Sequence, residues 1–188
     1  FVKDGSQNKS SKNKLKRLLK SGNVIGILLY RVQLIIEKKL FKFNSIENRK
    51  EILNALNEIP TIDVKPTRDR FFDVFNDEDS DRIGTYKVDI LLRQGFGIIK
   101  GKVLNVAKYG IWSFHHGDNT INRGGPPAFW EIILKEPVIG VTLQQLTTEL
   151  DGGLILDKGF YNRHWSVLRS NRNILDQCVS ILFKNIRK

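Results

Sequence analysis

Hydrophobic positions in the second half of the chain fall into short apolar runs separated by polar turns and helical patterns. Runs rich in β-branched and aromatic residues predict strands at residues 87–93, 109–114, 139–146 and 155–161. The first of these has the composition of a central parallel strand. A final helix is predicted at 170–186, with Ile174, Cys178, Ile181 and Leu182 on its inner face. Helices alternating with apolar strands indicate an α/β fold.

The first 60 residues have a different pattern, dominated by helical spacing. Helices are predicted at 14–21, 24–40 and 46–59, and a short strand at 61–65. An acidic run, Asp77-Glu78-Asp79, follows the apolar cluster at 71–75. We interpret it as an exposed helix start rather than a metal site, because aspartates favour the positive end of a helix. We therefore divide the chain into a basic helical N-terminal part, residues 1–60, and a core, residues 61–188, within one domain overall.

Charge is distributed unevenly along a chain that is otherwise globular in composition. Of 188 residues, 40% are hydrophobic, and the formal net charge is +11. Residues 1–50 carry 13 Lys and Arg against Asp4, Glu37 and Glu47, so most of the excess lies there. Such a region can bind phosphate, nucleic acid or an anionic membrane. A solvated basic helix face is the favoured interpretation, because no aromatic residues for base stacking are interleaved with the lysines.

The sequence also bounds the cellular setting. A single cysteine, Cys178, excludes an internal disulfide and fits a reducing compartment, so we expect a cytoplasmic protein. The longest apolar run, Val24 to Ile36, is interrupted by Arg31 and Gln33, which argues against a membrane span. The chain begins with Phe and contains no Met. We expect it to be part of a longer protein, with the first strand of its fold missing.

The stretch from Tyr109 to Leu156 carries the candidate chemistry. A strand leads into a polar, glycine-rich loop that contains His115 and His116, and a second strand leads into the turn Asp151-Gly152-Gly153. Ionisable residues thus follow two apolar strands, where open α/β sheets bind their ligands. Adjacent histidines rarely point at one ion, and no further ligand has metal-site spacing, so no metal is expected.

Several spacings in this stretch coincide. Arg123-Gly124 begin eight positions after His115, Pro127 and Trp130 follow, and Asp151 lies 36 positions after His115. In these residues the sequence resembles the formyltransferase family, which includes methionyl-tRNA formyltransferases, glycinamide ribonucleotide transformylases and sugar-nucleotide formyltransferases. That family has a strand ending Asn-x-His, then Arg-Gly-x-x-Pro, a Trp in many members, and a later aspartate. Looser similarity reaches back to residue 89 and covers about half of the chain.

The resemblance implies a fold and a reaction. The fold would be a Rossmann-like, mostly parallel sheet flanked by helices. The formyl donor would be 10-formyltetrahydrofolate and the acceptor a primary amine. Because no second domain is recognisable, a small acceptor such as a nucleotide-linked amino sugar is favoured. The alternatives are a catalytically impaired, formyltransferase-like binding module and a fragment of a methionyl-tRNA formyltransferase. A nucleic-acid partner for the basic N-terminal part is the weakest option.

The resemblance also implies roles for individual residues. His115 would act as acid and oxyanion partner, and Asp151 would orient it and accept a proton. The pterin slot would be lined by the backbone of Phe96, Gly97, Ile98 and Ile99 and of Thr147, Thr148, Glu149 and Leu150.

Two departures from the family pattern affect these roles. Ser113 stands where the family has an asparagine that helps to hold the oxyanion, and its hydroxyl is a shorter donor. His116-Gly117-Asp118-Asn119 replaces the family's Ser-Leu-Leu-Pro. Two interpretations stay open: His116 or Asn119 supplies the missing contact, or activity is low.

Overall fold

The computed structural model describes residues 1–5, 24–41, 54–55, 57–118, 127–149 and 152–187. The chain is divided into two compact units, Phe1–Asp63 and Val64–Lys188. Each unit is described by itself below.

The described residues of the first unit include a short strand pairing and a long helix. β1 (Val2–Asp4) pairs with β2 (Ile62–Val64), and the amide of Ile62 donates to the carbonyl of Phe1 at 2.7 Å. The helix α2 (Val24–Phe41) confirms the prediction for residues 24–40. The helix predicted at 14–21, and most of the one predicted at 46–59, lie outside the described residues.

The second unit begins with a three-stranded sheet and a capped helix. The sheet comprises β3 (Thr67–Asp69), β4 (Phe72–Val74) and β6 (Ile98–Lys100), with β3–β4 antiparallel and β4–β6 parallel. The helix α4 (Asp77–Gly84) starts after Asn76, whose side-chain oxygen accepts from the amide of Asp79. The acidic run is therefore a helix start, as predicted, since its carboxylates lie at the positive end of the helix. It is not exposed throughout, because Asp79 is buried.

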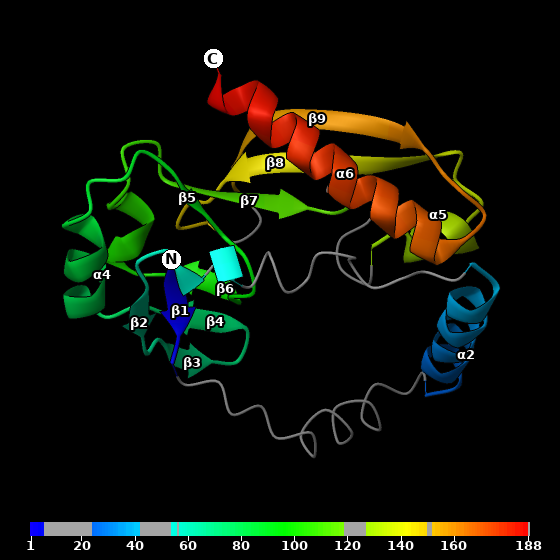
Figure 1. The fold of residues 1–188 in the computed structure, drawn as a ribbon, viewed down its shortest axis with the longest axis horizontal. Helices are drawn as coiled ribbons and strands as arrows, with labels where there is room; N and C mark the ends of the chain where they lie inside the picture. The colour runs from blue at the N-terminus through cyan, green and yellow to red at the C-terminus, as the bar shows by residue number, and fades with distance from the viewer. Residues whose placement is uncertain (6–23, 42–53, 56, 119–126, 150–151, 188) are drawn as a thin grey trace. The chain divides into compact units, whose positions relative to one another are not determined.

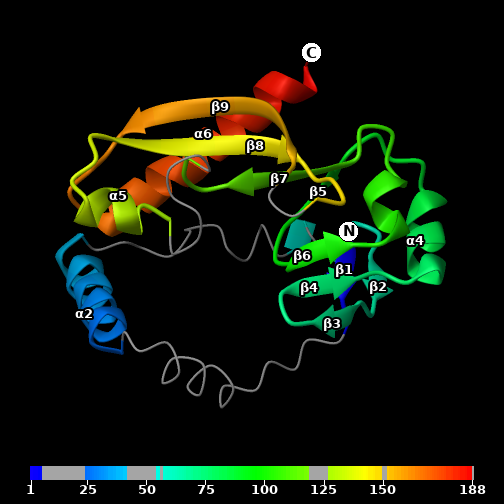
Figure 2. The ribbon, with the colours of Figure 1, turned by 180° about the vertical axis from the view of Figure 1, so that it is seen from behind.

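A four-stranded sheet forms the larger part of the second unit. Its strands are β5 (Leu91–Leu92), β7 (Ile111–His115), β8 (Val138–Gln145) and β9 (Leu154–Asn162), which pair in that order. The accompanying helices are η1 (Lys102–Asn105), α5 (Phe129–Ile133) and α6 (Val167–Ile186). Figure 1 and Figure 2 show α6 lying across one face of this sheet from opposite sides.

Strand directions make both sheets mixed. β5 and β7 are parallel, whereas β7–β8 and β8–β9 are antiparallel. β8 and β9 are joined by a short connection, which permits only an antiparallel pair because a parallel pair needs a long crossover. The α/β class is thus confirmed, but the described sheet is not mostly parallel. The strand predicted at 87–93 is parallel as expected, yet it lies at the edge of the described sheet rather than at its centre.

The core of the second unit forms between α6 and the sheet. Ile139, Val141 and Leu143 of β8 are almost fully buried and pack with Ile174 and Cys178 of α6. The predicted inner face of the final helix is therefore confirmed. A rigid, buried β8 gives the neighbouring end of β7 a fixed position, and the candidate site lies there.

Candidate functional site

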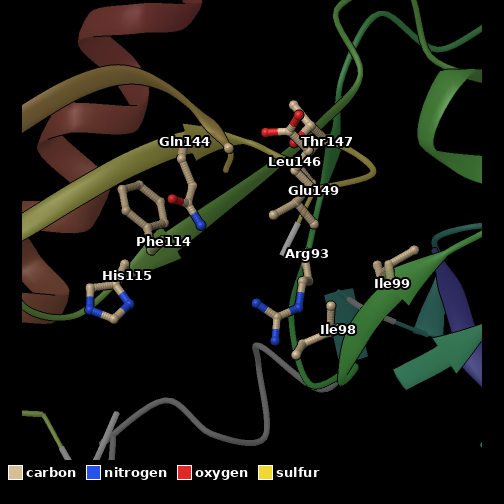
Figure 3. A pocket seen from close by; sticks show the side chains of 10 residues that line it. Arg93, Ile98, Ile99, Phe114, His115, Gln144, Leu146, Thr147 and Glu149 are labelled. Atoms are coloured by element: carbon tan, nitrogen blue, oxygen red, sulfur yellow. The ribbon is translucent and has the colours of Figure 1, made fainter. Parts of the chain in front are cut away.

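A pocket with a volume of about 140 Å³ opens at the end of β7 in the second unit (Figure 3). Its lining residues are Arg93, Ile98, Ile99, Phe114, His115, Gln144, Leu146, Thr147, Glu149 and Gly153. Six of them were singled out from the sequence: Ile98, Ile99, His115, Thr147, Glu149 and Gly153. A cavity of this size is smaller than the roughly 300–1,000 Å³ of sites for whole drug-sized ligands, so it suits one ring or one reacting group.

The backbone around His115 is fixed by contacts to β8 and β9. His115 is the last residue of β7 and pairs with Thr142, whose hydroxyl donates to the carbonyl of Gly117 at 3.4 Å. Asp118 forms a largely buried ion pair with Lys158 of β9 at 2.8 Å. The loop that leaves the site is therefore held against the sheet by both backbone and side chains.

His116 lies beside His115 in a different electrostatic setting. It is half-buried, and burial lowers the pKa of its imidazole from the ordinary value of 6.5. The neighbouring charge of His115 lowers the pKa of His116 further. His116 is therefore biased towards its neutral form, because burial and a nearby positive charge both disfavour the imidazolium.

Arg93 contributes the cation of the pocket and is held by oxygen atoms from two directions. Its Nε donates to the carbonyls of Phe96 at 3.1 Å and Gly97 at 2.9 Å, and Nη2 donates to Phe96 at 2.8 Å. Nη1 donates to Oγ of Ser113 at 2.9 Å. Burial lowers the pKa of the guanidinium, while the negative charge of Asp73 acts in the opposite direction. An arginine nevertheless stays protonated in proteins.

Ser113 is placed differently from what the resemblance implied. It lies within β7, is 1% exposed and is absent from the pocket lining. Because an arginine can only donate, the Ser113 oxygen accepts the bond from Arg93. The pocket wall next to Ser113 is thus formed by the guanidinium of Arg93 rather than by the serine hydroxyl.

The predicted pterin-binding segment 96–99 contributes side chains more than backbone. The amide of Gly97 donates to Oδ2 of Asp73 at 2.5 Å, and the amide of Ile98 donates to the carbonyl of Phe71 at 2.9 Å. The carbonyls of Phe96 and Gly97 accept from Arg93. These polar groups already have partners within the protein, and Phe96 and Gly97 do not line the pocket. Ile98 and Ile99 do line it.

The second predicted segment, 147–150, forms part of the opposite wall. Thr147 and Glu149 line the pocket, whereas Thr148 is described and does not. Leu150 and Asp151 lie outside the described residues. Gly153, which follows them in the sequence, also lines the pocket. A Cβ at Gly153 would lie 2.9 Å from the carbonyl oxygen of Gln145. That close approach to β8 explains why a glycine suits this position.

Sequence reasoning missed four lining residues: Arg93, Phe114, Gln144 and Leu146. Arg93 had a recognisable signal, because a charged residue directly after an apolar strand often faces a site at the end of a sheet. Gln144 and Leu146 had no such signal, since the strand pairing decides which side of the sheet their side chains face.

Two further properties of the described residues concern metal binding and membrane insertion. They contain no group of three or more His, Cys, Asp or Glu side chains placed to hold a metal ion. Within the same ranges, no helix has both the length and the apolar character needed to cross a bilayer.

Comparison with known proteins places this site in context. No protein-family model matches the chain. Over 76 residues the chain is 34% identical to a methionyl-tRNA formyltransferase of Prochlorococcus marinus. The matched residues cover 40% of this chain and 22% of that relative. The chain therefore spans about a fifth of the length of this curated relative.

Solved structures share the fold. One is glycinamide ribonucleotide transformylase 1 from Symbiobacterium toebii, with a TM-score of 0.50 and 21% identity over 57% of this chain and 52% of that one. Another is a formyltetrahydrofolate deformylase from Pseudomonas syringae pv. tomato, with a TM-score of 0.50 and 17% identity over 76% of this chain and 50% of that one. The resemblance to formyltransferase-family proteins is confirmed, in fold and in one stretch of sequence.

Proposed function

We propose that this chain, which resembles the formyltransferase family in fold and sequence, transfers a formyl group from 10-formyltetrahydrofolate to a primary amine. The acceptor we favour is a small molecule such as a nucleotide-linked amino sugar. The observation that carries the proposal is the joint position of His115 and Arg93 in one pocket that apolar and polar side chains line together.

The pocket suits the reacting end of the donor. Ile98, Ile99, Phe114 and Leu146 offer apolar surface for a flat ring, and Arg93, His115, Gln144, Thr147 and Glu149 supply polar groups around it. Apolar walls with a few convergent polar groups are typical of small-molecule sites. The volume of the cavity matches a ring and its formyl group rather than a whole folate.

His115 can serve the reaction in two ways. Its imidazole can donate a hydrogen bond to the oxyanion that forms when an amine attacks the formyl carbon. It can also deliver a proton to the folate nitrogen as that nitrogen leaves. Asp151 is the proposed partner that orients His115 and accepts the amine proton. It stands in the sequence between Glu149 and Gly153, which both line the pocket.

A second candidate concerns the acceptor. The relative that is 34% identical over 76 residues is a methionyl-tRNA formyltransferase. This similarity favours an aminoacyl group on a tRNA as the alternative amine, with the present chain as a part of such an enzyme. A folate-binding module without turnover is the third possibility, and it is motivated by the burial of Ser113 away from the pocket.

The decisive experiment follows a labelled formyl group from 10-formyltetrahydrofolate to each of two acceptors, a nucleotide-linked amino sugar and methionyl-tRNA. Wild type is compared with His115→Ala, and His164→Gln serves as a matched variant that removes an imidazole outside the pocket. We expect His115→Ala to lower the rate by about a hundredfold or more. His164→Gln should retain the wild-type rate.

The outcomes separate the candidates. Transfer to only one acceptor identifies it. Calorimetric binding of a folate analogue without transfer to either acceptor supports the binding module. If wild type neither binds the analogue nor transfers the formyl group, the proposal of a folate-dependent enzyme is wrong.

A further inference from the structure

Arg93 is an unusual cation for a protein interior, because the groups that hold it are neutral. Among the described residues it forms no ion pair, and its partners are two backbone carbonyls and one hydroxyl. Asp73, whose negative charge acts on Arg93, is engaged by the amide of Gly97 and by Nε of Arg68 at 3.2 Å. Glu149 lines the same pocket, but among the described residues it forms no ion pair with Arg93. Half-buried charges are normally paired, so a positive charge left facing a cavity suggests an anionic partner there.

The guanidinium of Arg93 also has donors to spare. It carries five N–H groups. The Nε proton is shared between the carbonyls of Phe96 and Gly97, one Nη2 proton goes to Phe96, and one Nη1 proton goes to Ser113. One N–H on each terminal nitrogen therefore has no partner within the described part of the chain. Figure 3 shows the guanidinium directed into the pocket that His115 also lines.

We infer that Arg93 binds the oxyanion that develops on the formyl group, and that Ser113 is a positioning residue that holds Arg93 for this task. The inference rests on the proposed formyl transfer and adds to it a residue that the family pattern did not assign. A guanidinium anchored on several oxygens is preorganised, so it stabilises developing charge without reorganising during the reaction. A cation does this more strongly than a serine hydroxyl, because charge-assisted hydrogen bonds are about twice as strong as neutral ones.

The step is a balanced acyl transfer. The lone pair of the amine forms a bond to the formyl carbon, and the electron pair of the C=O bond moves to oxygen, which then bears the negative charge facing Arg93. The C=O bond re-forms as the bond between carbon and the folate nitrogen breaks. That nitrogen takes a proton from His115, and the attacking nitrogen loses one to a water molecule, from which His115 is reprotonated. The products are a formamide and tetrahydrofolate, with no change in oxidation state.

Ser113 fits the positioning role through its burial. Its hydroxyl lies inside the sheet, where it accepts from Nη1 and cannot reach the cavity directly. Removing the hydroxyl leaves the other contacts of Arg93 intact while freeing one side of the guanidinium. The expected effect is therefore weaker than the loss of Arg93 itself.

The test measures binding of two folate analogues by calorimetry. One carries an aldehyde in place of the N-formyl group and adds water to give a tetrahedral hydrate, and the other carries a methyl group at that position. Arg93→Gln should weaken binding of the aldehyde analogue by about a hundredfold and leave the methyl analogue unaffected. Ser113→Ala should weaken only the aldehyde analogue, by about tenfold. Arg172→Gln, an exposed cation on α6, is the control and should change neither.

Three results would overturn the inference. Equal weakening of both analogues by Arg93→Gln means that Arg93 binds a carboxylate of the folate. If Arg93→Gln keeps the wild-type preference for the aldehyde analogue, an oxyanion role is excluded while the proposed function stands. If circular dichroism shows that Arg93→Gln is unfolded, the same conclusion is drawn from Ser113→Ala. If wild type binds neither analogue, the proposed function fails and this inference fails with it.

Discussion

At the scale of single residues, the two adjacent histidines make different contributions to the molecule. His115 lines the pocket, whereas His116 is half-buried, and burial together with the charge of His115 lowers the pKa of its imidazole. The chain must therefore release a proton from His116 when it folds at mildly acidic pH. This property affects the stability of the fold, which can be measured separately from the reaction.

The lowered pKa of His116 predicts the pH dependence of folding. Below the ordinary value of 6.5, the unfolded chain binds a proton at His116 that the folded chain does not. The free energy of unfolding should therefore be highest above that value. It should fall as the pH drops towards the lower pKa that His116 has in the folded state. Denaturant titrations between about pH 7.5 and about pH 5.5 measure the slope. In His116→Gln the slope should be shallower, and an identical slope would show that His116 is not buried as a neutral group.

Arg93 and Ser113 show what single-residue reasoning from the sequence could and could not achieve. The spacing to the later residues drew attention to Ser113, which lies inside β7 and outside the pocket lining. It could not show that the serine oxygen is already occupied, because the donor lies 20 positions earlier in the chain. Contacts of this kind depend on the parallel pairing of β5 with β7, which no local pattern encodes.

At the scale of elements, the loop after β7 depends on a close backbone approach to β8. A Cβ at Gly140 would lie 2.6 Å from the amide nitrogen of Asp118 and 2.9 Å from its Cα. These are backbone atoms, so they cannot be displaced without moving the loop. Glycine at this position thus couples the course of the loop that follows His115 to the register of the sheet.

Gly140→Ala should accordingly lower the free energy of unfolding by about 1–3 kcal/mol, because overpacking a close contact forces the backbone apart. It should also shift the NMR signals of His115 and His116. The matched control is Gly84→Ala in α4, where the new Cβ would meet its nearest atoms at 3.9 Å, an ordinary contact. Equal effects of the two substitutions would mean that the loop does not lie against β8 as described.

Element prediction from the sequence succeeded where a local pattern decides the outcome. Composition identified the strands that became β7, β8 and β9, and the acidic run identified the start of α4. The sequence did not determine strand directions, because apolar runs of similar composition pair in either direction. The edge position of β5 was missed for the same reason, since a run of leucine, isoleucine and valine suits a central strand as well as an edge.

At the scale of the whole molecule, the division into Phe1–Asp63 and Val64–Lys188 predicts two units that unfold separately. Ile174 is 2% exposed in the core of the second unit, whereas its neighbour Leu175 is 57% exposed. Ile174→Ala should destabilise that unit by about 2–5 kcal/mol, through lost burial and the cavity left behind. Leu175→Ala should stay within about 0.5 kcal/mol and is the matched control on the same helix.

Hydrogen exchange tests whether this destabilisation stays within one unit. Amides of β7, β8 and β9 should lose protection together in Ile174→Ala, because contiguous packed elements open as a cooperative unit. The amide of Ile62, which donates to the carbonyl of Phe1 in the other unit, should keep its wild-type exchange rate. If Ile62 loses protection by the same factor as β8, the two units form one cooperative structure. The pocket, which is built entirely from the second unit, would then also depend on the first 63 residues for its stability.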